Sequence, residues 1–328
     1  FNTKLYTGDG ATTLAVSGVG FQPDFTWIKN RDQADDHTLV DSVRGATKYL
    51  VSNDTDAEVD DSTFVASLDS DGFTVGDDVV VNTSTENYAS WNWKAGGTAV
   101  SNTDGTITSS VSANTDAGFS IVTYSGNLTA GATVGHGLGV VPSMMIFHRL
   151  NTGGTDWIIY HSTLGATQNL AFDTSAAITS STRFNNTAPS SSVFTLGTTV
   201  AVNGSADTYV AYCFHSVDGY SKVGSYEGNN NVDGAFVYCG FKVSMVLIKN
   251  IDSAGNDWLI FDDKRDTYNL VNQTLFPNAS DDEATASTGY DFVSNGFKAR
   301  STAANKNQAY TYLYYAVAES PFKYSNAR

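Results

Sequence analysis

Few residues of this sequence have both the type and the spacing that catalysis or metal binding requires. No two of the five histidines have the spacing of a zinc-binding helix; they are His37, His136, His148, His161 and His215. The sequence also lacks a G-x-S-x-G nucleophile elbow and the glycine-rich motifs that cradle phosphates. We therefore predict that the chain is not an enzyme and has no catalytic residue, metal ligand or cofactor.

Acidic clusters are the nearest approach to a metal site. The segment DTDAEVDD at 54–61 loosely resembles a calcium loop, and DDE at 281–283 is a second cluster. The first lacks the mid-loop glycine and the correctly placed final glutamate, so we expect both to be solvated loops. A carboxylate pair for glycoside hydrolysis remains an open alternative, because folding and not spacing brings such a pair together.

The five tryptophans have two interpretations. Exposed aromatic rings could form a sugar-binding platform, whereas Trp27, Trp157 and Trp258 lie in apolar, repeated strand positions that favour a core. Trp91 and Trp93 alternate in one strand and so share a face. They are the candidates for ligand-facing aromatics, although their counterparts Tyr212 and Phe214 again favour a core.

Two cysteines do not make a disulfide framework. Cys213 and Cys239 could link two parts of the chain, but buried free thiols are the expected state.

Charge excludes several kinds of partner. The chain has 328 residues and a net charge of −16, so we expect no nucleic-acid binding. No apolar stretch approaches the roughly 20 residues of a membrane span, and we expect no membrane insertion. The chain begins at Phe1 without a signal-like segment, so we expect a processed product or a piece of a longer chain.

The same pattern of residues occurs three times along the chain. DHTLVDSVRGATKYL at 36–50 returns as DWIIYHSTLGATQNL at 156–170, and a shorter form, DWLIFDDKRDTYNL, stands at 257–270. Each copy is followed by a closing aromatic strand: YASWNW, YVAYCF and YLYYAV. Turn signals such as SDG at 70–72 and SNG at 294–296 predict hairpins, with the glycine inside the turn.

A repeat of about 105 residues has the size of a small domain and exceeds the roughly 20–50 residues of solenoid repeats. Abundant aromatics, threonine and turn residues predict an all-β chain. We predict three tandem β-sandwich, jelly-roll-like repeats at 1–117, 118–217 and 218–328, packed about a pseudo-threefold axis.

Long stretches of the sequence resemble a family that carries a repeated domain of unknown function. They are the run 209–246, DWLIFDDKRDTYN at 257–269, DFVSNGF at 291–297, the ending 312–328 and WNWKAGG at 91–97. That family recurs in virion and tail-fibre-like proteins of marine tailed bacteriophages. The resemblance implies a virion component, and it brings no known catalytic or ligand-binding residues.

We therefore expect a structural protein of a phage particle, assembled in the bacterial cytoplasm: a tail fibre, spike or head decoration. Its partners would be other virion proteins and copies of itself, with a homotrimer as the default. Loops that differ between the copies, at 52–62, 173–192 and 276–288, would recognise a host-surface glycan or protein. The alternatives are a host-glycan-binding module or depolymerase, and an extracellular filament subunit.

Overall fold

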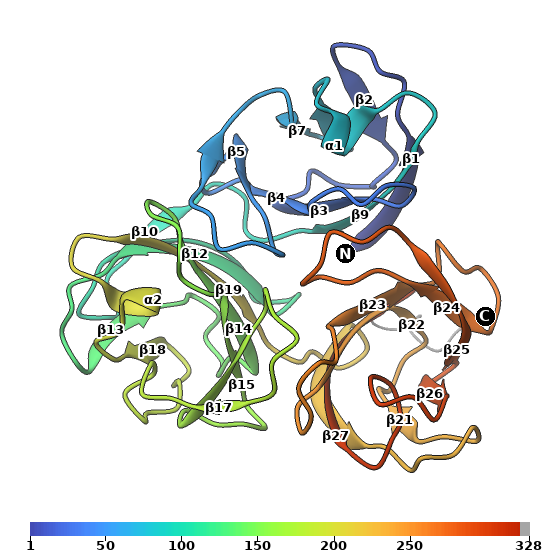
Figure 1. Cartoon of the computed structure of the whole chain (residues 1–328). Coiled ribbons are helices and arrows are strands. Elements are labelled where there is room, and N and C mark those ends of the chain that lie inside the picture. Colours follow the sequence, from blue (N-terminus) through green and yellow to red (C-terminus); the bar gives the residue numbers. More distant parts are fainter. Residues whose placement is uncertain (322–328) are drawn as a thin grey trace.

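The prediction of an all-β chain is confirmed by a computed structural model that describes residues 1–321 (Figure 1). Residues 322–328, the end of the stretch that resembles the phage family, lie outside the described residues. All ladders between the named strands are antiparallel, and the two helices, α1 (Val79–Asn82) and α2 (Val200–Asn203), are single turns. Within residues 1–321, no helix has the length and apolar character needed to cross a membrane.

Figure 1 shows three lobes arranged around a centre. In lobe 1, a six-stranded sheet in the order β1-β9-β3-β4-β5-β6 faces a three-stranded sheet, β2-β8-β7. Its strands are β1 (Asn2–Thr7), β2 (Leu14–Ser17), β3 (Phe25–Asn30), β4 (Thr38–Asp41), β5 (Gly45–Leu50), β6 (Val59–Asp60), β7 (Val65–Asp69), β8 (Gly72–Val75) and β9 (Asn87–Trp93).

Lobe 2 has an eight-stranded sheet in the order β10-β11-β12-β19-β14-β15-β16-β17 and a pair, β13-β18. Its strands are β10 (Val100–Asn102), β11 (Ser109–Asn114), β12 (Phe119–Ser125), β13 (Ala132–Gly135), β14 (Met144–Arg149), β15 (Ile158–His161), β16 (Gln168–Ala171), β17 (Thr179–Ser180), β18 (Val193–Leu196) and β19 (Thr208–Phe214).

Lobe 3 has two four-stranded sheets, β20-β27-β22-β23 and β21-β26-β25-β24. Its strands are β20 (Ser221–Glu227), β21 (Phe236–Tyr238), β22 (Val243–Asn250), β23 (Leu259–Asp262), β24 (Val271–Thr274), β25 (Ala284–Val293), β26 (Gly296–Arg300) and β27 (Thr311–Ala318).

The larger sheets share one strand order. In lobes 1, 2 and 3, the strands β1, β12 and β20 pair with the closing aromatic strands β9, β19 and β27. Each closing strand then pairs with a fully or largely buried strand: β3, β14 or β22. The expected boundary at residue 117 differs from the structure in one respect. Strands β10 and β11 precede it in sequence, yet β11 pairs with β12 of lobe 2.

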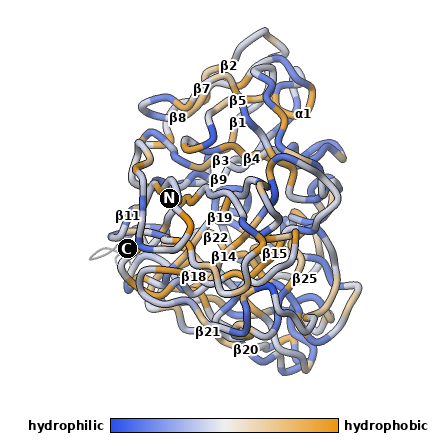
Figure 2. Tube along the Cα trace, turned by 90° about the vertical axis from the view of Figure 1, so that its left-hand side faces the viewer, coloured by the Kyte–Doolittle hydropathy of each residue, from blue (hydrophilic) through white to orange (hydrophobic). Residues whose placement is uncertain are grey.

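Each large sheet is covered on both faces, which explains why its central strands are not amphipathic. One face packs on the smaller sheet of its own lobe, and the other packs on the other lobes. In Figure 2, hydrophobic stretches lie among the interior strands, and the peripheral loops are largely hydrophilic. The molecule therefore has one core in each lobe and a fourth core in the centre.

The two predicted hairpins are present, but their glycines do not lie in the turns. Asp69 pairs with Gly72 and Val293 with Gly296, so the turn residues are Ser70–Asp71 and Ser294–Asn295. Each glycine instead begins the next strand.

Candidate functional site

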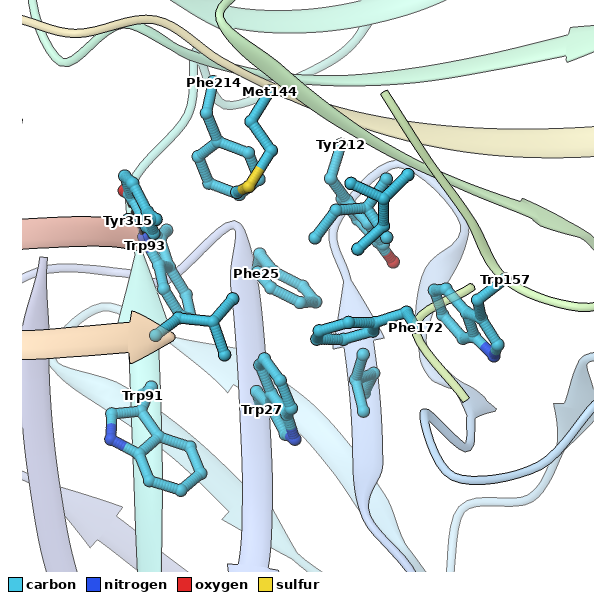
Figure 3. Close-up of a cluster of buried hydrophobic side chains, with 14 of the residues drawn as sticks. Phe25, Trp27, Trp91, Trp93, Met144, Trp157, Phe172, Tyr212, Phe214 and Tyr315 are labelled. Carbon is cyan, nitrogen blue, oxygen red and sulfur yellow. Dashed lines mark hydrogen bonds between the residues drawn. The ribbon is translucent and has the colours of Figure 1, made fainter. Parts of the chain in front are cut away.

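The central core collects all five tryptophans of the chain. Trp27, Trp91, Trp93, Trp157 and Trp258 each have 4 % exposure or less, and all belong to the cluster that joins the lobes. Figure 3 shows aromatic side chains from lobes 1, 2 and 3 converging there. Trp91 and Trp93 are 0 % and 3 % exposed, so neither ring faces a surface that a ligand could reach.

The lobes contribute equivalent positions to this core. Phe25, Met144 and Met245 each pair with the last core residue of a closing strand: Trp93, Phe214 and Val317. Two residues along, the pairs are Trp27–Trp91, Ile146–Tyr212 and Leu247–Tyr315. Trp27 therefore matches Ile146 and Leu247, and the prediction that Trp27, Trp157 and Trp258 are core residues is confirmed.

His37 is the counterpart of Trp157 and Trp258 in lobe 1. These three residues stand immediately before the equivalent strands β4, β15 and β23. Each uses a ring nitrogen to hold a backbone carbonyl of another lobe. Trp157 Nε1 donates to Val51 O at 2.9 Å, and Trp258 Nε1 donates to Ala171 O at 3.1 Å. His37 Nε2 contacts Phe276 O at 3.0 Å, while its Nδ1 accepts from Trp27 Nε1.

These contacts follow one direction around the ring of lobes. A side chain of lobe 2 contacts the backbone of lobe 1, a side chain of lobe 3 contacts the backbone of lobe 2, and a side chain of lobe 1 contacts the backbone of lobe 3. A backbone hydrogen bond reinforces each contact. The pairs are Glu58 N to Leu150 O (2.8 Å), Ile178 N to Ile251 O (3.3 Å) and Glu283 N to Arg31 O (2.9 Å).

The held loops belong to the three segments that the sequence suggested for recognition, 52–62, 173–192 and 276–288. Part of each segment makes a contact between lobes, and recognition of a host surface by these segments stays a prediction.

Lobes 1 and 3 each bury a set of three charged side chains at the junction. In lobe 1, Arg44 Nε donates to Asp41 at 2.5 Å, and Arg44 Nη1 lies 3.0 Å from Glu58. In lobe 3, Arg265 Nε donates to Asp262 at 2.6 Å, and Nη1 lies 2.9 Å from Glu283.

The aspartate of each set also accepts a hydrogen bond from a side chain of a neighbouring lobe. Tyr212 Oη donates to Asp41 at 2.8 Å, and Trp91 Nε1 donates to Asp262 at 3.1 Å. The Arg265 guanidinium also lies 5.6 Å from the centre of the Trp91 ring, within cation–π range.

Lobe 2 replaces the whole charged set with uncharged groups. His161, Leu164 and Ile178 stand where lobe 1 has Asp41, Arg44 and Glu58. His161 Nδ1 accepts from Thr163 N, as Asp41 accepts from Val43 N. Burial lowers the pKa of His161 to about 4, against an opposing effect of the Tyr314 backbone, so this ring is neutral at pH 7.

A second set of equivalent positions holds buried nitrogen bases. Lys29 Nζ donates to the carbonyls of Asn30 and Gln33, Lys249 Nζ donates to Ser175 O, and His148 Nε2 contacts Asp56 O. Burial lowers the pKa of both lysines to about 8 and that of His148 to about 4. These groups tie loops to strands.

A groove opens at the junction of lobes 1 and 2, with a volume of about 750 Å³. Lobe 1 contributes Val43, Arg44, Lys48, Ala57 and Glu58. Lobe 2 contributes hydroxyl-bearing residues of β10, β11, β12 and β19 and the end of β14, namely Ser101, Thr108, Ser109, Ser110, Thr123, Tyr124, Ser125, Leu150, Asn151, Thr208 and Tyr209.

Lys48 and Glu58 shape one wall of this groove. Lys48 Nζ lies 3.1 Å from Glu58 Oε1, and Arg44 binds the other carboxylate oxygen. The Arg44 side chain is 2 % exposed and the Lys48 side chain is 39 % exposed. Lys48 therefore connects the buried charged set of lobe 1, through Glu58, to the solvent in the groove.

The remaining candidates do not assemble into a site. Cys213 and Cys239 are both buried free thiols, and burial raises the pKa of each to about 12. Within residues 1–321, no three His, Cys, Asp or Glu side chains are placed to hold a metal ion. In the acidic segment 54–61, Glu58 turns to Arg44 and Lys48, and Asp60 accepts a hydrogen bond from Thr47.

Sequence reasoning missed both the buried charged sets and the groove. The charged sets had a usable signal, because D-x-x-R at 41–44 and 262–265 becomes H-x-x-L at 161–164 in the aligned copies. The groove had no signal in the sequence, because its two walls come from segments far apart in the chain that no local pattern connects.

Comparison with known proteins places the chain in a family. No curated protein and no solved structure matches it. A family model described as a domain of unknown function, DUF7483, matches residues 1–321, the same residues that form the three lobes. The chain therefore belongs to the DUF7483 family.

Proposed function

We propose that this chain is a structural component of a phage virion, exposed on a tail fibre, a spike or the head surface. The shared central core is the observation that carries the proposal. It joins strands from all three lobes, with Phe25, Met144 and Met245 at equivalent positions. A closed ring of lobes around an aromatic core makes a stiff body, which suits a part that transmits or resists force.

The sequence resemblance to tail-fibre-like proteins supports the same proposal. The segments that carry it include the closing strands β9, β19 and β27 and the strand β22, which build the central core.

Imaging native particles of the encoding phage by cryo-electron microscopy tests the proposal. We expect three-lobed density of this shape on a fibre, a spike or the capsid exterior. Purified, intact particles without this chain, judged by both the map and mass spectrometry, would contradict it. A filament of this chain outside any particle would support the alternative of an extracellular filament subunit.

The expected homotrimer can be tested on the isolated protein. Sedimentation equilibrium gives the mass of the assembly, and the particle map gives the number of copies at each position.

A further inference from the structure

The groove between lobes 1 and 2 presents an ordered array of hydroxyl groups. Ser101 pairs with Ser110 and Ser110 with Thr123, so three hydroxyl side chains on adjacent strands form one row across the sheet. Ser125 pairs with Thr208 two residues along, which starts a second row on the same face.

These hydroxyls are not used to hold the fold. Within residues 1–321, the side-chain oxygens of Ser110, Thr123, Ser125 and Thr208 make no hydrogen bond to another protein group, and the same holds for Ser101 and Thr108. A free hydroxyl both donates and accepts. The wall can therefore bind a molecule that also offers donors and acceptors at short intervals.

The charges at this wall belong to a set with no net charge. Arg44, Lys48 and Glu58 line the groove, and the buried Asp41 behind Arg44 neutralises its guanidinium through an ion pair. A groove with no excess of either sign does not favour a phosphate or another strongly ionic ligand. Val43, Ala57 and Leu150 add apolar surface, so the groove is about equally polar and apolar.

These features select a class of ligand. We propose that this groove is a binding site for a neutral saccharide. The hydroxyls of a sugar match the hydroxyl rows, and its C–H faces match the apolar surface. Lys48 and Glu58 can form hydrogen bonds with the substituents of the sugar ring. The volume of about 750 Å³ falls within the range of about 300–1,000 Å³ that is usual for small-molecule sites.

Within residues 1–321, the hydroxyl-bearing wall of this groove has no equivalent in the large sheets of lobes 1 and 3. The strands β10 and β11 that extend its wall belong to lobe 2 alone. At the position of Lys48, two residues before the equivalent leucines Leu50, Leu170 and Leu275, the other copies have Gln168 and Gln273. One saccharide site per chain is therefore expected.

The test uses the isolated, full-length chain, so its outcome does not depend on where the chain lies in a particle. An array of neutral and anionic oligosaccharides identifies a probe, and calorimetry then gives its Kd and stoichiometry. We expect binding to a neutral probe at one site per chain.

Variants then locate the site. The double substitution Thr123→Val and Thr208→Val removes two hydroxyls and keeps the branched shape, and it should weaken binding at least about tenfold. Lys48→Gln takes the residue of lobe 2 and should also weaken binding. The control is Ser225→Ala, because Ser225 is an exposed serine at the position of Thr123 in lobe 3 and lies outside the groove.

Three results would overturn the proposal. They are no binding to any neutral saccharide on the array, binding to anionic probes only, and binding that the groove variants and Ser225→Ala affect equally. Circular dichroism of each variant confirms that it is folded before its affinity is compared.

Discussion

At the residue scale, the three copies solve one packing problem in two ways. Lobes 1 and 3 bury an aspartate, an arginine and a glutamate at the junction, whereas lobe 2 uses His161, Leu164 and Ile178. All three members differ together. This pattern agrees with the general finding that a buried ionic set can be replaced as a whole but not in part, because one unpaired buried charge is costly.

The first prediction follows from this comparison. Arg44→Leu alone leaves the buried Asp41 without its cation and Glu58 with Lys48 alone, and it should lower the free energy of unfolding by about 3–5 kcal/mol. The triple variant Asp41→His, Arg44→Leu, Glu58→Ile copies lobe 2 and should recover most of that loss. Urea denaturation measures both. A triple variant as unstable as the single one would show that these residues depend on other features of lobe 1.

The second prediction concerns acid stability. Burial lowers the pKa of His37 to about 3 and that of His148 and His161 to about 4, from an ordinary value near 6.5. The unfolded chain therefore binds more protons between about pH 6.5 and 4, and stability falls as the pH falls through that range. Asp173 acts in the opposite direction, because burial raises its pKa to about 6.

The three histidines and Asp173 together leave about two protons, which corresponds to a fall in the free energy of unfolding of about 3 kcal/mol per pH unit near pH 5. Burial also lowers the pKa of His136 and that of the Phe1 amino group, which adds to this fall, and it raises the pKa of Asp263, which opposes it. Denaturant titrations at several pH values measure the slope. His148→Gln should reduce this slope by the contribution of one proton, about 1.4 kcal/mol per pH unit. The control is His215→Gln, because the ring of His215 lies nearer the surface. A flat profile between pH 6 and 4.5 would contradict the assignment.

At the scale of the element, close approach of two backbones explains residues that turn chemistry alone does not. Gly72 and Gly296 begin strands β8 and β26 with φ values of +152° and +159°. A Cβ atom would lie 2.0 Å from Val16 O at Gly72 and 1.9 Å from Val237 O at Gly296. The neighbouring strands β2 and β21 can pack at these points only because no side chain intervenes.

The third prediction compares two glycines of lobe 1. Gly72→Ala should destabilise the protein by about 3 kcal/mol or more, since it combines backbone strain with a steric clash. Gly20 has a φ of +87° and no atom within 4 Å of its added Cβ, so Gly20→Ala should cost only about 1–2 kcal/mol. Thermal unfolding of the two variants checks the order, and equal losses would show that the carbonyl contact is unimportant.

At the scale of the whole molecule, the central core makes the lobes depend on one another. All five tryptophans lie in that core and none in the cores within the lobes. Tryptophan fluorescence therefore reports the joining of the lobes, while far-ultraviolet circular dichroism reports the strands of every lobe.

The fourth prediction uses this separation. Because each large sheet buries a face against the other lobes, we expect one cooperative transition in guanidinium chloride, with the fluorescence and dichroism curves superimposed. A fluorescence change that precedes the loss of strands would mean that the lobes separate before they unfold. Residues 98–217 expressed alone should bind a hydrophobic dye, because Met144, Ile146 and Tyr212 would be exposed.

Much of the fold could be read from the sequence because strand formation depends on local features. Closing segments such as YASWNW and YVAYCF predicted strands, and they form β9 and β19. The all-β class followed from composition and turn signals. The hairpins at 69–72 and 293–296 followed from the same local chemistry, although the glycine was displaced by one position.

The pattern of apolar residues in a sequence, however, indicates which residues are buried. It does not indicate which other part of the chain packs on them. The sequence by itself determined the all-β class, the positions of the closing strands and the burial of Trp27, Trp157 and Trp258. Only the tertiary structure decided that Trp91 and Trp93 face other lobes, that loops 52–62, 173–192 and 276–288 contribute to holding the ring, and that β10 and β11 join lobe 2. The physical reason is distance along the chain: contacts such as Asp41–Tyr212 and Asp262–Trp91 join residues 171 positions apart, and only the closed ring brings them together.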